Sequence, residues 1–296
     1  MLLRESRGFF SWLVILTVAW LEIIILWKIL CSENIKNELD SCEQVKKRPF
    51  GHSGGLSDSA GPLDIVRWHY WNNLGACKNM RFFGGWIWRG AVKYQELMDG
   101  HKALCLDENI RPVPGNCLVY SFGVKNDWSF ENAMMNYGCE VHGFDPSIDV
   151  PKQTEERQFI FHKIGLQGKD EVNANGWQMK TLRSIMKLLG HENRILDFIK
   201  LDIEESEYEA IPNMIETGVT EQIKQIALET HNFSMDEKDR QRYYYKYKQI
   251  WKLEKHGFIR FNSQAAMGTD RLNKIGNMSD FYCYEMAWYN PKFYFV

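Results

Sequence analysis

The chain has 296 residues, of which 36 are basic and 38 acidic, giving a formal net charge of -2. This near balance argues against the strongly basic surface that nucleic-acid binding requires, so we expect no nucleic-acid partner. Aromatic residues make up 14% of the chain, and most of them should fill a core. The length suits one α/β domain that follows shorter N-terminal segments.

Residues 1–30 contain the apolar run FFSWLVILTVAWLEIIILW, in which the single charge is Glu22. A helix of this length crosses a bilayer, since each residue adds about 1.5 Å. A cleaved signal peptide is the alternative, but its apolar region commonly spans only about 7–15 residues. We therefore expect residues 1–30 to be a short tail and a transmembrane signal anchor. Basic residues occur on both sides of the run, so its orientation stays open.

Residues 31–62 are polar and end in FGHSGGLSDSAGP, which is typical of a flexible stem. Residues 63–116 gather aromatic side chains around Gly84 and Gly85, and we expect them to form a helical cap. The main domain should then cover residues 117–296. Glycosylation acceptor patterns at Asn232 and Asn277 favour a luminal position for it.

From residue 117 the chain alternates strand-like and helix-like segments, as a doubly wound α/β sheet requires. Seven runs have the character of strands, namely LVYSFGV, EVHGFD, FIFHKIGL, ILDFIKLDI, QIKQIALETH, FIRFNS and FYCYEMAWY. Residues typical of helix ends predict four helices between them. The first covers about 126–138 and the second 181–189. The third begins at Ser206, which forms a capping box with Glu209, and the fourth ends at Gly257.

The seven cysteines include no C-x-x-C pair and no Cys/His spacing typical of zinc. We therefore expect no metal site. Cys117 and Cys139 each open one of the first two strand-like runs, so their thiols start side by side if those strands are neighbours. A disulfide between them is one alternative, and two free thiols are the other.

The stretch CLVYSFGVKNDWSFENAMMNYGCEVHGFDPS, residues 117–147, has the layout of an adenosine site. In an open parallel sheet the ligand lies at the carboxyl ends of the strands, close to the first strand-to-helix turn. Gly123 occupies that turn, where a missing Cβ allows a close approach. Asp145 follows the second strand, where an acid accepts hydrogen bonds from both ribose hydroxyls. Because G-x-G-x-x-G is absent, a phosphate-free ligand such as S-adenosylmethionine fits best; the alternative is an ordinary α/β turn.

Two blocks of the chain also resemble a known family. The stretch above is similar to the first two strands of the methyltransferase-like protein 24 group, and DFIKLDIEESEYEAIPNMI is similar to the fourth strand and helix of FkbM-type methyltransferases. The resemblance covers about residues 77–290. It implies a class I, Rossmann-like methyltransferase fold with the strand order 3-2-1-4-5-7-6 and with S-adenosylmethionine as cofactor.

Carried over by position, the resemblance implies a cofactor site across the strand ends. Gly123 and its neighbours would lie under the methionine end, Asp145 would hold the ribose, and Asp202 would face the transferred methyl group. Ser121 stands where class I enzymes commonly carry an acid, so either Asp127 or Asp202 replaces that acid or cofactor affinity is weak. The full set of expected cofactor-binding residues is Phe122, Gly123, Asn126, Asp145, Pro146, Ser147 and Asp202.

Methyl transfer is an in-line displacement from a sulfonium, so the protein must align donor and acceptor and manage one proton. Acids and a histidine follow the fourth and fifth strands. We expect Asp202 or His231 to accept the proton of an acceptor hydroxyl, with Glu229 in the same acidic wall. Glu204 and Glu205 are better explained as acids at the start of a helix.

The sequence thus favours a membrane-anchored S-adenosylmethionine-dependent methyltransferase that methylates a hydroxyl of a small molecule or a glycan. Its domain would lie in the Golgi or endoplasmic reticulum lumen, or be secreted. A luminal glycosyltransferase using a nucleotide sugar is an alternative, although the Asp-x-Asp pattern is matched only imperfectly at Asp202 and Asp145. A non-catalytic binding module on a methyltransferase fold is a third reading, which Ser121 favours.

Overall fold

The computed structural model describes residues 60–73, 75–89, 96–149, 160–231, 240–266, 272–275, 278–281 and 283–294. The predicted anchor, nearly all of the predicted stem, and both glycosylation asparagines, Asn232 and Asn277, lie outside these ranges. Within them, no helix combines the length and the apolar character that a membrane span needs.

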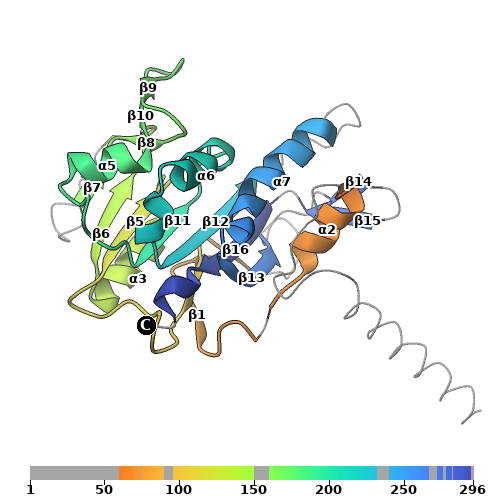
Figure 1. The fold of residues 1–296 in the computed structure, drawn as a ribbon, viewed down its shortest axis with the longest axis horizontal. Coiled ribbons are helices and arrows are strands. Elements are labelled where there is room, and N and C mark those ends of the chain that lie inside the picture. The colour runs from red at the N-terminus through yellow and green to blue at the C-terminus, as the bar shows by residue number, and fades with distance from the viewer. Residues whose placement is uncertain are drawn as a thin grey trace, which may run out of the picture. The chain divides into compact units, whose positions relative to one another are not determined.

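The seven runs expected to be strands form one seven-stranded sheet (Figure 1). Its spatial order is β13-β16-β12-β11-β5-β6-β7, which is the order that the family resemblance implied. In chain order the strands are β5 (Leu118–Phe122), β6 (Glu140–Phe144), β7 (Ile160–His162), β11 (Phe198–Leu201), β12 (Gln225–His231), β13 (Ile259–Ala265) and β16 (Cys283–Tyr289).

One strand departs from the expected parallel sheet. Strand β16 is antiparallel to both of its neighbours, β12 and β13, whereas the pairs from β12 to β7 are parallel. The helix α7 (Arg240–Lys255) lies between β12 and β13 in the chain, and β13 is the edge strand opposite β7. In the described residues between β13 and β16, only the hairpin-like pair β14 (Leu272–Ile275) and β15 (Met278–Phe281) occurs. Without a crossover helix the chain re-enters the sheet in the opposite direction.

Helices cover the sheet, and its alternating side chains pack in two separate buried clusters (Figure 1). Leu118, Tyr120 and Phe122 belong to the cluster that includes residues of α2, α5, α6 and α7. Val119 and Phe198 belong to the other, with residues of α3 and β4. These elements are α2 (Pro62–Tyr70), β4 (Lys102–Cys105), α3 (Ser129–Tyr137), α5 (Leu182–Leu188) and α6 (Glu207–Glu216).

The predicted start of α6 is confirmed, and α5 and α7 match the expected helices. Helix α3 begins later than predicted, and the predicted cap of α6 is wrong. Helix α3 begins at Ser129, later than expected, because the Asp127 side chain accepts the Ser129 N–H at 2.9 Å and prolongs the turn. Helix α6 follows Ser206, but Ser206 is itself in a helical conformation and makes no side-chain cap. The Glu207 carboxylate instead accepts the Ile203 N–H at 2.8 Å, so the expected capping box does not form.

Among the described residues of the expected helical cap, 63–116, only α2 is helical. Two antiparallel pairs follow it, β1 (Met80–Phe83) with β4 and β2 (Trp86–Arg89) with β3 (Glu96–Asp99). Gly84 has a left-handed φ of 71°, and a Cβ on it would lie 2.5 Å from the backbone of α3. The turn that follows β1 therefore requires glycine at this position. Because β4 packs on β12 and β16, the segment joins the same compact unit, Gly51–Val296.

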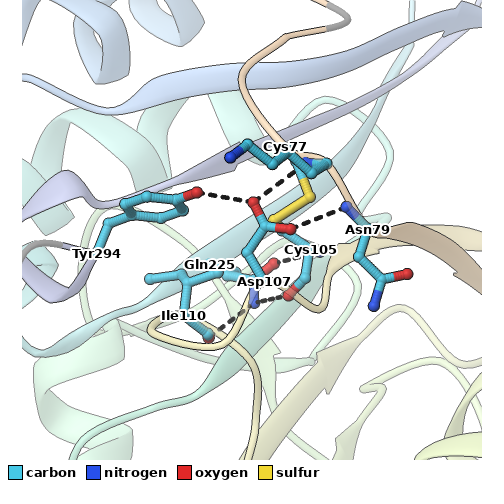
Figure 2. Close-up of a disulfide and its surroundings, with 8 residues drawn as sticks. Cys77, Asn79, Cys105, Asp107, Ile110, Gln225 and Tyr294 are labelled. Carbon is cyan, nitrogen blue, oxygen red and sulfur yellow. Dashed lines mark hydrogen bonds between the residues drawn. A yellow bond between two sulfur atoms is a disulfide. The ribbon is translucent and has the colours of Figure 1, made fainter.

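Two disulfides cross-link this unit. Cys117–Cys139 connects the residues that precede β5 and β6, which confirms the first of the two alternatives for these thiols. Cys77–Cys105 connects the segment before β1 to the end of β4 (Figure 2). Both bonds lie within residues 77–139, around the first two strands of the large sheet.

Hydrogen bonds surround the Cys77–Cys105 disulfide and fix β4 against the sheet (Figure 2). The Asp107 carboxylate accepts the Asn79 N–H at 2.8 Å and the Tyr294 hydroxyl at 2.8 Å. The buried Gln225 side chain accepts the Cys105 N–H at 2.8 Å and donates to the Cys105 carbonyl at 2.9 Å. The start of β12 and the end of β4 are thereby joined.

Candidate functional site

The candidate site lies at the carboxyl ends of β5, β6, β11 and β12, and Gly123 is at its centre. Gly123 has a φ of 77°, and a Cβ on it would lie only 1.7 Å from the Asp202 carbonyl oxygen. Its N–H donates to the Phe144 carbonyl at 2.9 Å, and its own carbonyl accepts from Lys200 Nζ at 3.1 Å. Only glycine allows the ends of β5 and β11 to approach this closely.

A cavity of about 460 Å³ opens beside Gly123, and we call it the aromatic pocket. The rings of Phe122 and Phe144 stack in its wall with centroids 4.4 Å apart. Trp177 and Met179 line the same cavity. Met179 belongs to β10 (Gln178–Lys180), which forms a small three-stranded sheet with β8 (Gly165–Leu166) and β9 (Glu171–Val172), and Trp177 directly precedes β10. Flat and apolar surfaces of this kind suit a nucleobase. The other lining residues are Gly123, Lys125, Asp145, Pro146, Ser147, Gly165, Leu166, Gln167, Asn173, Asn175, Asp202, Ile203, Glu204 and Ser206.

Asp145 supplies the buried carboxylate of the aromatic pocket and is only 3% exposed. One of its oxygens accepts the N–H of Ser147 at 2.8 Å and the Ser147 hydroxyl at 2.5 Å. The other accepts the Lys125 N–H at 2.8 Å. A carboxylate has about four acceptor positions, so one position remains for a ligand hydroxyl. Two ribose hydroxyls could bind only if the Ser147 hydroxyl turned away.

A second cavity, of about 680 Å³, adjoins the first, and we call it the acidic pocket. Four residues line both cavities, namely Gly123, Lys125, Asp202 and Glu204. Lys125 forms an ion pair with Glu204 at their junction. The other residues of the acidic pocket are Asp99, Gly100, Val124, Asn126, Asp127, Lys200, Glu229 and His231.

Asp202, His231 and Glu229 form the wall of the acidic pocket that the sequence predicted. His231 Nε2 lies 3.5 Å from Asp202 Oδ1, and His231 Nδ1 lies 3.6 Å from Glu207 Oε1. Burial opposes a charge on His231, but the hydrogen bond to Glu207 and the nearby carboxylates raise its pKa to about 9. A protonated imidazole donates a proton, so Asp202 is better suited than His231 to accept one.

The two carboxyls of this wall differ in acidity. Burial and then the negative charge of Asp202 raise the pKa of Glu229. Burial also opposes ionisation of Asp202, but the charges of Lys102, Lys200 and His231 outweigh it and lower the Asp202 pKa. Lys102 comes from β4 and is fully buried against a carboxylate of β16, that of Glu285, at 2.5 Å. A segment predicted to be a helical cap thus contributes the positive charge behind the pocket.

Ser121 does not stand alone at the position where class I enzymes commonly carry an acid. Its hydroxyl donates to Glu131 Oε1 at 2.5 Å, and Glu131 is fully buried in α3. Lys200 Nζ lies 3.9 Å from the same oxygen while it also holds the Gly123 carbonyl. A buried acid of the next helix therefore accepts a hydrogen bond from Ser121, but neither Ser121 nor Glu131 lines either pocket.

A family model for a methyltransferase domain matches residues 88–278 of this chain. That range includes more than half of the chain, both pockets and the strands β5 to β12. The chain belongs to this family.

Two relatives of this methyltransferase domain confirm the resemblance seen in the sequence. A human protein named probable methyltransferase-like protein 24 is 30% identical over 207 residues, which are 64% of this chain and 56% of the relative. A rat protein of the same name is 29% identical over 189 residues, or 60% of this chain and 51% of the relative. The chain therefore spans about half the length of the curated relatives that it matches.

Among solved structures, the phosphoethanolamine N-methyltransferase 2 of Haemonchus contortus, in complex with S-adenosyl-L-methionine, is 11% identical with a TM-score of 0.36. The match covers 62% of this chain and 51% of that one. A SAM-dependent methyltransferase from Agrobacterium tumefaciens is 9% identical with a TM-score of 0.36, over 61% and 58% of the two chains.

Every residue that the sequence proposed for the site of this methyltransferase domain lines one of the two pockets. Phe122, Asp145, Pro146 and Ser147 line the aromatic pocket. Asn126, Glu229 and His231 line the acidic pocket, and Gly123 and Asp202 line both. Asn126 therefore lines a different cavity from Asp145. The roles of these residues in catalysis and cofactor binding stay predictions.

Sequence reasoning missed several residues of the site. Trp177 and Met179 lie outside the seven strands, and no local pattern marks them as pocket residues. Lys200 did carry a signal, since it is a charged residue inside the apolar run ILDFIKLDI. Lys125, two residues after Gly123, reaches across to Glu204, a contact that no spacing rule indicates.

Proposed function

We propose that this methyltransferase domain binds S-adenosylmethionine across its two pockets and transfers the methyl group to an acceptor in the acidic pocket. The observation that carries the proposal is the meeting of the two cavities at Gly123 and Asp202. One cavity suits a nucleoside and the other suits cationic and proton-donating groups. A ligand with a nucleoside at one end and a sulfonium near its middle matches this order.

The aromatic pocket fits the adenosine part of the cofactor. Trp177 offers a flat apolar surface to the base, and Phe122 and Phe144 are buried behind the pocket wall. Asp145 accepts three internal hydrogen bonds, which leave one acceptor position that a ribose hydroxyl can take. The pocket is small enough, at about 460 Å³, to enclose a nucleoside.

The acidic pocket fits the reacting end. S-adenosylmethionine supplies a methyl group on a positively charged sulfonium, and carboxylates near that charge favour its binding. Asp202 lines both cavities, so its carboxylate can stand beside the sulfonium and accept the proton of an acceptor hydroxyl. We therefore propose O-methylation of a hydroxyl, on either a small molecule or a glycan.

We further propose that the domain is held to a membrane by residues 1–30 and lies on the luminal side. Support comes from the apolar run FFSWLVILTVAWLEIIILW and from the two disulfides, Cys77–Cys105 and Cys117–Cys139. Disulfides persist in secretory compartments and are rare in the cytosol. Non-reducing peptide mapping of the chain from cells should recover both linkages, and glycosidase should remove sugar from Asn277. Free thiols at all four cysteines would refute the luminal position.

Calorimetry with S-adenosylmethionine tests the cofactor assignment on the full-length chain. The variant Asp145→Asn removes a charged acceptor, and hydrogen bonds to charged groups contribute about 1.5–3 kcal/mol. Affinity should then fall by about 10-fold or more. Asp149→Asn is the matched control, because the Asp149 side chain is 94% exposed and lines neither pocket. No heat with millimolar cofactor, or equal affinity for both variants, would contradict the proposal.

A further inference from the structure

We propose that the floor of the acidic pocket is a binding site for a divalent transition-metal ion, Zn²⁺ or Mn²⁺. Its ligands are Glu229, His231 and Cys283, and Asp202 is a further carboxylate beside His231. No sequence pattern predicts a metal site here, because these residues come from three different strand ends. The fold brings them together.

The donor atoms lie at separations that one ion can bridge. Ligand atoms of Glu229, His231 and Cys283 all lie within 4.8 Å of one another. His231 Nε2 is a further 3.5 Å from Asp202 Oδ1. In the sheet, Cys283 of β16 is the direct partner of His231 of β12, so both side chains are held by backbone pairing. Imidazole, carboxylate and thiol are the donors that Zn²⁺ takes, and imidazole with carboxylates also suits Mn²⁺.

A buried carboxylate stands behind the histidine, as in many metal sites. Glu207 is fully buried and approaches His231 Nδ1 at 3.6 Å, on the opposite side of the ring from Asp202. The same Glu207 oxygen accepts the Ile203 N–H at 2.8 Å, which fixes its position. A carboxylate on one ring nitrogen orients the other nitrogen toward a metal. Metal binding would displace the proton from that second nitrogen.

The charge around the pocket leaves two carboxylates for an ion. Lys102, the buried cation behind the wall, is paired with Glu285. Lys200 lies 3.9 Å from Glu131 Oε1, and Lys125 is paired with Glu204. Glu229 is only 9% exposed and Cys283 only 7%. Asp202 and Glu229 both line the cavity, so an ion can enter from solvent. Together they match the charge of a divalent cation.

The role of this ion depends on the proposed methyl transfer, but its binding can be measured independently of that function. An ion at this position would hold the acceptor hydroxyl through its oxygen and acidify it beside Asp202. Metal uptake is measurable without any acceptor and without S-adenosylmethionine.

The experiment uses the full-length chain, dialysed against EDTA and then titrated with ZnCl₂, MnCl₂ or MgCl₂ in a calorimeter. Bound metal is counted by mass spectrometry after gel filtration. We expect one Zn²⁺ or Mn²⁺ per chain and weaker binding of Mg²⁺. Glu229→Gln and His231→Asn should each weaken binding by at least about 10-fold, and Glu207→Gln by about 10- to 100-fold. Thermal melts establish that each variant is folded.

A second Glu–His group provides the control. Glu140, His142 and His191 also bring their ligand atoms within 4.8 Å of one another, but Glu140 there is paired with Arg194 at 2.8 Å. Glu140→Gln should leave metal binding unchanged. Loss of the metal in Glu140→Gln but not in Glu229→Gln would overturn the proposal, and so would no uptake of Zn²⁺ or Mn²⁺ by the unmodified chain.

A cobalt spectrum gives a test that needs no variant. Co²⁺ in a tetrahedral site with nitrogen and oxygen ligands shows strong visible bands, and thiolate coordination by Cys283 adds a charge-transfer band. A spectrum equal to that of Co²⁺ in buffer would refute the site. Calorimetry with S-adenosylmethionine on the metal-free chain separates the two proposals: cofactor binding without metal uptake refutes only the metal, and the reverse result refutes only the cofactor.

Discussion

Replacing Gly123 by alanine should disrupt the site more than the fold. An L-residue at the left-handed φ of 77° costs about 1–2 kcal/mol. The added Cβ would lie 1.7 Å from the Asp202 carbonyl oxygen, and Cβ contacts below 3.0 Å essentially do not occur. The end of β11 must therefore move, and crowding of this kind costs about 1–3 kcal/mol more. A displacement of Asp202 of about 1 Å could lower methyl transfer by about 100-fold.

Gly218 offers the matched control for this prediction. It has a φ of 71°, and a Cβ there would meet nothing within 4 Å, so Gly218→Ala carries only the backbone cost. Urea unfolding gives the free energy of unfolding of both variants, and calorimetry gives their affinity for S-adenosylmethionine. We expect Gly123→Ala to be the less stable by about 1–3 kcal/mol and to bind the cofactor poorly. Equal stability and normal cofactor binding would show that the ends of β5 and β11 are not packed as described.

Two further predictions concern stability. Burial, followed by the charges of His142 and His191, lowers the pKa of His162 to about 4 from an ordinary 6.5. On acidification the unfolded chain therefore binds a proton at His162 before the folded chain does. The stability that His162 contributes should be fully present above pH 6.5 and should be lost as the pH falls from 6.5 to 4. The full shift corresponds to about 3 kcal/mol, which partial exposure reduces to about 2 kcal/mol. The free energy of unfolding is measured against pH for the unmodified chain and for His162→Gln. Equal pH dependence of the two would refute this assignment. Trp68→Ala should lower the free energy of unfolding by about 3–5 kcal/mol, because Trp68 is fully buried and its indole N–H donates to Glu254 at 3.1 Å; Tyr70→Ala, in the same helix but 50% exposed, should change it by less than about 1 kcal/mol in the same urea titration.

Local patterns predicted the strands because strands that are buried on both faces appear in the sequence as short, mostly apolar runs. The runs LVYSFGV and EVHGFD are apolar on both sides, and both faces of the sheet are covered in the structure. Gly123 and Asp145 could be found for a related reason: a glycine after one strand and an acid after the next are local features whose spatial relation follows from parallel pairing.

Other features depended on contacts between residues far apart in the chain. Ser206 and Glu209 match a capping box, but Glu207 reaches Ile203 and His231, and this tertiary contact replaces the cap. The aromatic segment before residue 117 was expected to be helical, yet β4 pairs with β1 and packs on the sheet. There the energy of burial outweighs local preference.

The sequence by itself determined the succession of strands and helices, the glycine turn, the acid of the second strand and, through resemblance, the order of the sheet. These follow from side-chain periodicity and from short-range backbone geometry. Only the tertiary structure decided that the Ser121 hydroxyl donates to the buried Glu131, and that Lys102 of β4 lies behind Asp202. It alone placed Cys283 beside His231. Such pairs depend on the packing of strands and helices that are distant in the chain, where long-range burial and charge compensation select the partners.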